Sequence, residues 1–153
     1  MKIVLDNNVL VSGLLTPFGP SGEILRMVFA GGVVLCLDAR ILAEYKDVLQ
    51  RPKFKLNKDH LAVVLDFIKQ YGQFISSSPL KNRLPDINDE PFLEVAIAGN
   101  AISLITGNSV HYPSSPFQGI NIFSPSEFVE FYRKQDNRDA RKQYPDSRTQ
   151  GGG

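Results

Sequence analysis

Four short runs of apolar residues lie along the chain, each bounded by polar or turn-forming residues. They occupy residues 2–5, 33–37, 102–105 and 120–123. Continuous apolar runs of this length are typical of strands that are covered on both faces, because a half-exposed strand would alternate apolar and polar positions. The pattern therefore predicts four buried β-strands.

Between these runs, apolar residues recur at the three- and four-residue spacing of helices that bury one face. The clearest cases span residues 41–49 and 61–68, and further helices are expected over 21–30, 91–98 and 125–132. Strands that alternate with helices predict an α/β domain of three layers, in which helices flank a central parallel sheet. In such domains the functional side chains gather at the carboxyl ends of the strands.

Length and composition indicate one globular domain. The chain has 153 residues, of which 42% are hydrophobic and 22% are charged, and it is too short for two ordinary domains. After Tyr132 apolar residues almost disappear and Arg and Lys predominate. We therefore expect a domain over residues 1–132 and a basic polar tail over 133–153, which is more simply explained as a solvated extension than as an RNA-binding arm.

The charge balance is nearly neutral, with 17 Lys and Arg against 16 Asp and Glu. A nucleic acid would therefore have to be bound by a local basic patch. Arg51, Lys53 and Lys55 form one candidate patch, although a solvated surface explains these three residues equally well.

Several site classes and locations are disfavoured by the sequence. Cys36 is the only cysteine, so an intramolecular disulfide is excluded and a buried thiol is expected. His60 and His111 lie in different segments, which argues against a zinc site and favours surface roles for both. No apolar stretch approaches the length of a membrane span or a signal peptide, so a cytoplasmic protein is expected.

Acidic and polar residues follow the predicted strands or lie on the predicted helices. Asp6 follows the first strand, Glu44 borders the apolar stripe of its helix, and Asp86 and Asp89 precede the helix over 91–98. Thr106 and Asn108 follow the third strand. Each has an ordinary structural interpretation, since Asp6 and Asp89 suit helix N-caps, Glu44 suits a solvated helix surface, and Thr106 and Asn108 suit a turn.

The order and spacing of these segments resemble the PIN domain family, and within it a branch of bacterial toxins from toxin–antitoxin pairs. The resemblance is carried by residues 3–12, 41–45, 86–96 and 104–108, and segments 51–54 and 124–128 also look like that branch. It implies a parallel-sheet α/β fold and cleavage of RNA with Mg²⁺ or Mn²⁺. It maps Asp6, Glu44 and Asp89 to the metal-binding and catalytic acids.

Two positions depart from the family's usual pattern. Asn108 stands where the family usually has an Asp, and a neutral amide is a poorer ligand for a hard cation, which puts a second metal site in doubt. Asn7 stands where Thr or Ser is common, but it can still orient a carboxylate or a water molecule. We expect Asn7, Asp86, Thr106 and Asn108 to support the metal ligands from an outer shell.

Two other functions compete with a metal-dependent ribonuclease. A haloacid dehalogenase-type phosphotransferase also begins with a strand-terminal Asp, but it needs a second Asp where this chain has Asn8. A catalytically weakened PIN domain that binds RNA or an antitoxin without cleavage is kept open by Asn108. An antitoxin partner and a dimer are expected from the resemblance, and residues 61–67 are a candidate dimer interface, although core packing explains them better.

Overall fold

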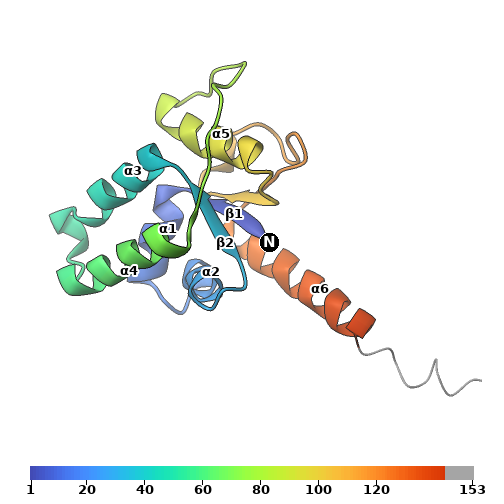
Figure 1. Ribbon diagram of the computed structural model, residues 1–153, viewed down its shortest axis with the longest axis horizontal. Coiled ribbons are helices and arrows are strands. Elements are labelled where there is room, and N and C mark those ends of the chain that lie inside the picture. Colours follow the sequence, from blue (N-terminus) through green and yellow to red (C-terminus); the bar gives the residue numbers. More distant parts are fainter. Residues whose placement is uncertain (144–153) are drawn as a thin grey trace, which may run out of the picture.

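The computed structural model describes residues 1–143 (Figure 1). Strands and helices alternate along most of the chain. In chain order the elements are β1 (Lys2–Leu5), α1 (Asn7–Leu15), α2 (Pro20–Phe29), β2 (Val34–Leu37), α3 (Ala39–Leu49), η1 (Pro52–Phe54), α4 (Lys58–Tyr71), β3 (Gln73–Phe74), η2 (Ile87–Asp89), α5 (Glu90–Ala98), β4 (Ser103–Ile105), η3 (Ser109–His111), β5 (Asn121–Phe123) and α6 (Pro125–Gln143).

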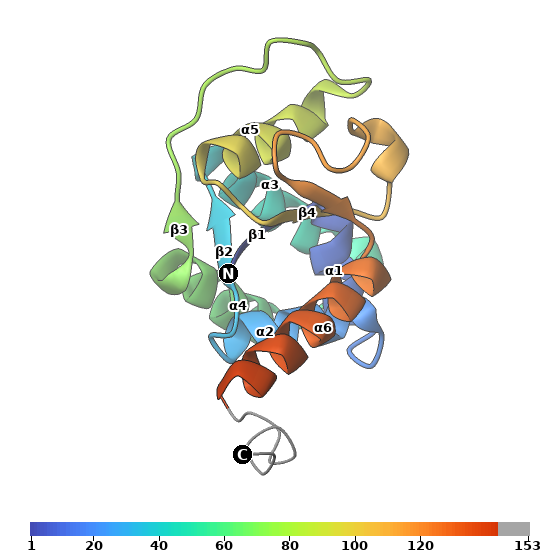
Figure 2. The ribbon, with the colours of Figure 1, turned by 90° about the vertical axis from the view of Figure 1, so that its right-hand side faces the viewer.

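The sheet has five parallel strands in the order β3-β2-β1-β4-β5. Helix α5 packs against β1, β2 and β4 on one face, and α6 lies with α2 on the opposite face, where it contacts β4 and β5 (Figure 2). The predicted three-layer α/β fold with a central parallel sheet is therefore confirmed. Strand β3 was not predicted, because its two residues are exposed and carry no apolar run.

The core fixes α3 to the end of the central strand β1. Ile3, Val4 and Leu5 of β1 are fully buried, as is Tyr45 of α3. The Tyr45 hydroxyl donates a 2.6 Å hydrogen bond to the carbonyl oxygen of Leu5. Because Leu5 immediately precedes Asp6, this bond places α3 beside the carboxyl end of β1. Cys36 is buried and free, as expected.

Helix α6 continues well beyond the predicted end at Tyr132. The continuation lacks an apolar stripe, so periodicity did not reveal it, but ion pairs stabilise it: Lys134 lies 3.2 Å from Glu130 one turn earlier. Arg133 also pairs with Glu23 of α2 at 2.8 Å. Residues 144–153 of the expected tail lie outside the described residues, and the boundary after residue 132 stays a prediction. Within residues 1–143, no helix combines the length and apolar character that crossing a bilayer requires.

Candidate functional site

Asp6 lies at the carboxyl end of the central strand and at the N-cap position of α1, but its carboxylate makes no capping hydrogen bond. Instead its Oδ2 atom accepts a 2.8 Å hydrogen bond from the Thr106 hydroxyl and a 3.3 Å bond from the Tyr112 hydroxyl. The residue is buried, with 6% of its surface exposed. The capping interpretation of this carboxylate is therefore wrong, since its donors come from segments about 100 residues away in the chain.

Glu44 projects from α3 toward the start of α1. Its Oε1 atom accepts a 2.6 Å hydrogen bond from the side-chain amide of Asn7. The Asn7 Oδ1 atom is buried and has no donor among the described residues. Burial is the main cause that raises the pKa of Glu44; the Asn7 bond opposes this rise, and the charge of Asp6 adds to it. Glu44 is thus a half-buried carboxylate at a shared site rather than a solvated helix residue.

The two acids of the η2 segment behave differently. Asp86 is exposed and accepts a 2.9 Å hydrogen bond from the backbone N–H of Asn88, which makes it the cap of η2. Asp89 makes no capping hydrogen bond, although it lies at the N-cap position of α5. Its buried Oδ2 atom lies 3.3 Å from His111 Nδ1 without hydrogen-bond geometry. Asp89, and not Asp86, is therefore the acid of this segment whose carboxylate remains unused by the local backbone.

The segment after β4 supports Asp6. Thr106 is buried, donates to Asp6, and accepts a 3.0 Å hydrogen bond from the backbone N–H of Asn108. Asn108 is exposed, and its side chain makes no hydrogen bond within residues 1–143. Thr106 therefore orients the Asp6 carboxylate, whereas the Asn108 amide lies free at the rim.

The acids interact electrostatically. Burial is the main cause that raises the pKa of Asp89, and the negative charges of Asp6 and Asp86 add to the rise, while His111 opposes it. Asp6, Asp89 and Asp86 likewise contribute to the raised pKa of Glu44. The fold thus brings Asp6, Glu44 and Asp89 to one end of the sheet. In the part of the chain that the structure describes, however, no three His, Cys, Asp or Glu side chains are grouped so that they could hold a metal ion.

Two other buried acids show how this protein satisfies a structural carboxylate. Glu94 accepts hydrogen bonds from Arg40 at 2.8 Å and from the backbone N–H of Leu80 at 3.2 Å. Glu90 accepts from the backbone N–H of Leu84 at 3.0 Å and lies 3.4 Å from Arg83. Buried carboxylates normally require such partners.

Asp6, Glu44 and Asp89 form no ion pair with any Lys or Arg of the described chain. Glu94 and Glu90 each have an Arg partner, whereas the basic side chain found beside the three acids within residues 1–143 is His111, next to Asp89. This contrast marks the three acids as a distinct group.

The sequence did not reveal Tyr112 and His111. Tyr112 is buried in the loop after η3, and burial, followed by the charges of Asp6 and Asp89, raises its pKa far above its usual range, so its hydroxyl remains a donor. His111 is partly exposed, as expected for a surface residue, but its imidazole also faces Asp89, which the sequence did not indicate. A tyrosine or histidine in an irregular loop carries no periodic signal, so the pattern of apolar positions could not place either residue.

If Asp6, Glu44 and Asp89 hold Mn²⁺, as the family resemblance implies, replacing Tyr112 with Phe is expected to weaken Mn²⁺ binding by about tenfold, the lower end of the effect of removing a group that orients a ligand. The hydrogen bond from Tyr112 to Asp6 is 3.3 Å long, which is outside the ordinary O–H···O range. The Thr106→Val variant removes the shorter 2.8 Å bond to Asp6, so it should weaken Mn²⁺ binding more than Tyr112→Phe does. Isothermal titration calorimetry with melting curves would test this order. Tyr71→Phe on the exposed end of α4 serves as control; equal affinities for all variants would contradict the prediction.

The predicted basic patch does not converge on the acids. Arg51 pairs with Asp47 at 3.4 Å, and the Lys53 ammonium lies 5.0 Å from the centre of the Phe54 ring. These contacts belong to the segment between α3 and α4. Binding of RNA by this patch stays a prediction.

A model of the PIN domain matches residues 2–109, which is most of the chain and includes β1, Glu44, Asp89 and Thr106. The chain belongs to the PIN domain family. An uncharacterized protein of Methanocaldococcus jannaschii is 28% identical to this PIN domain protein over 145 residues, covering 88% of this chain and 93% of the relative. Tyr112 and His111 follow the matched segment.

A solved structure has the same fold as this PIN domain protein. It is the crystal structure of VapBC2 from Rickettsia felis bound to a DNA fragment from their promoter. The match has a TM-score of 0.50 and 19% identity, and it covers 80% of this chain and 98% of that chain. The likeness supports the PIN-like α/β architecture described above.

Proposed function

We propose that this PIN domain protein is an endoribonuclease that hydrolyses RNA phosphodiester bonds with the help of Mg²⁺ or Mn²⁺. The observation that carries the proposal is the group of three acids, Asp6, Glu44 and Asp89. Burial and the charge of Asp6 raise the pKa values of Glu44 and Asp89, and none of the three acids has a Lys or Arg partner in the described chain. Carboxylates in this situation are best neutralised by a cation. Hydrolysis of DNA and of other phosphodiesters would use the same chemistry. The choice of RNA as substrate rests on the family resemblance.

The residues present fit a hard divalent cation in their chemistry. Asp89 Oδ2 is a buried carboxylate oxygen without a hydrogen-bond donor, and Asn7 Oδ1 is a buried amide oxygen in the same state. Asp6 Oδ1 accepts no hydrogen bond from the described residues, since both donors bind Oδ2. Asp6, Glu44 and Asp89 would hold the ion, with adjustment of their side chains. When bound, such an ion activates water and stabilises charge on the phosphodiester oxygens.

The protein's own side chains would prepare the site for this reaction. Thr106 and Tyr112 fix the Asp6 carboxylate through one oxygen and leave the other free. Asn7 fixes Glu44, which would ligate the ion or position the attacking water. Asp86 contributes negative charge from the exposed rim while it caps η2, and Asn108 supports Thr106 through its backbone N–H.

The test is a metal titration combined with an RNA cleavage assay on pure protein, for the wild type and for Asn108→Asp. The exposed amide of Asn108 is the neutral position in an acidic site, so an Asp there is expected to raise Mn²⁺ affinity by about tenfold or to add a second bound ion per chain. Calorimetry gives both affinity and stoichiometry. Asn82→Asp, on the exposed loop before Asp86, is the matched control and should leave both unchanged.

A second candidate is a weakened PIN domain that binds RNA or an antitoxin without cutting. Two observations favour it: Asn108 is neutral, and residues 1–143 contain no assembled group of three metal ligands. The same assay separates the two functions. Wild-type protein that binds Mn²⁺ and RNA but leaves the RNA intact, while Asn108→Asp cleaves it, would establish the weakened form.

We also propose that the protein is the toxin of a toxin–antitoxin pair, acts in the cytoplasm and forms a dimer. This rests on the resemblance of residues 3–12, 41–45, 86–96 and 104–108 to the toxin-type branch. Expression of wild-type protein should arrest growth, and expression of the Asp6→Asn variant should not. Equal growth with both would argue against a toxin.

A further inference from the structure

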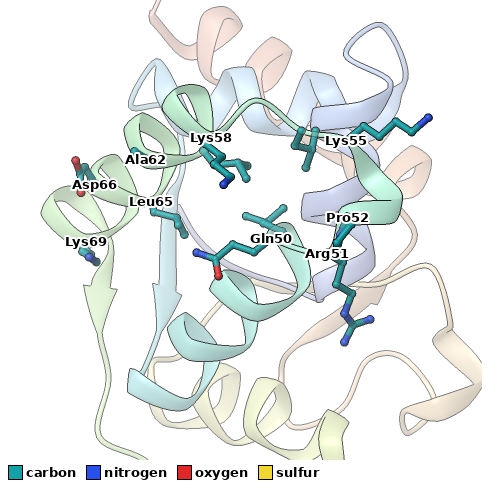
Figure 3. Close-up of a pocket in the computed structure, with 12 residues that line it drawn as sticks. Gln50, Arg51, Pro52, Lys55, Lys58, Ala62, Leu65, Asp66 and Lys69 are labelled. Carbon is teal, nitrogen blue, oxygen red and sulfur yellow. The ribbon is translucent and has the colours of Figure 1, made fainter.

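A concave feature lies away from the acids, between the C-terminal end of α3, the η1 turn and α4 (Figure 3). Its volume is about 770 Å³, and neither Asp6, Glu44 nor Asp89 lines it. Gln50 and Lys58 point into it from opposite sides, whereas Arg51 and Lys55 point outward at one end (Figure 3). This α3–α4 pocket is therefore separate from the proposed catalytic site.

The floor of the α3–α4 pocket is apolar. Leu49, Leu61 and Leu65 are buried side chains that line it, and Leu56 is half-buried beside them. None of the described residues that line the pocket is aromatic. An occupant would therefore gain binding energy by covering leucine side chains, and it would find no ring on which a nucleobase could stack.

The rim of the pocket is cationic. Among the described residues, the cations Arg51, Lys55, Lys58 and Lys69 line the pocket, and Asp66 is the one acid that does so. Of these cations, only Arg51 forms an ion pair within residues 1–143, and its partner Asp47 is largely exposed. An excess of unpaired positive charge around one cavity is notable in a chain whose net charge is only +1.

Two lysines of the rim each have one unfavourable electrostatic interaction. Lys58 is the first residue of α4, where the helix dipole favours an acid rather than a cation. Lys69 lies close enough to Lys46 of α3 that it lowers the pKa of that neighbouring ammonium. An anionic partner would relieve both arrangements.

We propose that the α3–α4 pocket docks an acidic amphipathic segment of a partner protein, with apolar side chains on the leucine floor and carboxylates on the lysine rim. Charge complementarity selects an acidic occupant, and the leucine floor selects one that also carries apolar side chains. A single-stranded RNA supplies the charge but little apolar surface for the leucines, and the lining lacks the aromatic platforms that such strands use. The proposal does not depend on nuclease activity.

The test uses a synthetic helical peptide of about 18 residues, long enough to be helical in water, with leucines on one face and glutamates on the other. Fluorescence anisotropy measures its affinity for the intact protein, and amide chemical shifts map the contact. We expect binding with shifts on α3 and α4. Lys58→Glu combined with Lys69→Glu should weaken binding at least tenfold, and both side chains are exposed, so the fold is retained.

Three controls make the outcome decisive. Lys134→Glu with Lys142→Glu changes the charge equally on α6 and should leave peptide affinity unaltered. A peptide of the same composition with its leucines dispersed around the helix should bind at least tenfold more weakly. The Asp6→Asn variant should bind the peptide like the wild type, so a failed nuclease assay leaves this result intact.

Three results would overturn the proposal. Equal binding of the two peptides would show attraction by charge alone. Unaltered peptide affinity in the Lys58→Glu, Lys69→Glu variant would place the contact elsewhere. Binding of an oligouridine that this variant loses, without any binding of the peptide, would make the pocket part of a nucleic-acid surface.

Discussion

The Asp6→Asn variant is expected to lose metal-dependent RNA cleavage by more than about a hundredfold, beyond the effect of changing a group that only supports a ligand. Asp6 is the acid that both Thr106 and Tyr112 orient, and its charge acts on Glu44 and on Asp89. An amide keeps the size of the carboxylate but removes its charge. Cleavage of a labelled RNA, measured with Mn²⁺ and with a chelator, checks the loss.

The same variant should fold normally and should melt no lower than the wild type without metal. Removing one negative charge from a group of acids relieves repulsion, which offsets the weaker hydrogen bonds from Thr106 and Tyr112. Asp47→Asn is the matched control, because Asp47 lies on the exposed side of α3 and pairs only with Arg51 in the described chain. Undiminished metal-dependent cleavage by Asp6→Asn would refute the assigned role.

Addition of Mn²⁺ at about pH 7.5 is expected to raise the melting temperature of the wild type, and the increase should vanish near pH 4. At an ion concentration about 100 times the dissociation constant, binding contributes about 2.7 kcal/mol. For a domain of this size that corresponds to a shift of roughly 5–10 °C. Differential scanning calorimetry across pH, with and without Mn²⁺, measures both effects.

The direction of the pH effect follows from the raised pKa values of Glu44 and Asp89. A carboxyl whose pKa is higher in the folded than in the unfolded state favours folding when it is protonated. That contribution is complete below the unfolded values, near pH 4, and is lost as pH rises through the raised folded values. As the pH rises and these groups ionise, the metal-free fold carries the repulsion between the acids, which a bound cation relieves.

In the Asp6→Asn variant, Mn²⁺ should raise the melting temperature by less than in the wild type at every pH. An increase in the melting temperature of the wild type that does not depend on pH would show that the ion binds away from the three acids. An equally large increase in Asp6→Asn would show the same.

Most of the fold was predictable because parallel strands that are buried on both faces have continuous apolar runs in the sequence. β1 begins and ends as predicted, and the predicted runs over 33–37, 102–105 and 120–123 each differ from β2, β4 and β5 by one residue at the start. The exceptions depend on tertiary contacts. β3 exists because Gln73 and Phe74 pair with β2, and the end of α6 is supported by ion pairs.

The candidate site was predictable in its acids and in Asn7 and Thr106, the predicted supporting residues that donate hydrogen bonds to Glu44 and Asp6. Asp6, Glu44 and Asp89 follow from strand ends, helix faces and the family resemblance, and the structure places them near one another. Their assignment as metal ligands remains a proposal. Tyr112 and His111 lie beside the acids because of the path of the segment after β4, which no periodicity of the sequence predicts. For the same reason the sequence could not show that Asp86 caps η2 whereas Asp89 does not.

The position of Asp6 directly after the central strand has a consequence for how the site responds to fluctuations. Its backbone N–H is bonded to the carbonyl oxygen of Ile105, and β1 has a neighbouring strand on both sides, so slow amide exchange is expected there. Tyr112 and His111 belong to short irregular segments that can open without disturbing the sheet. Warming should therefore release Tyr112 and His111 from the acids first, and under the proposed function metal-dependent cleavage would be lost several degrees before the sheet unfolds.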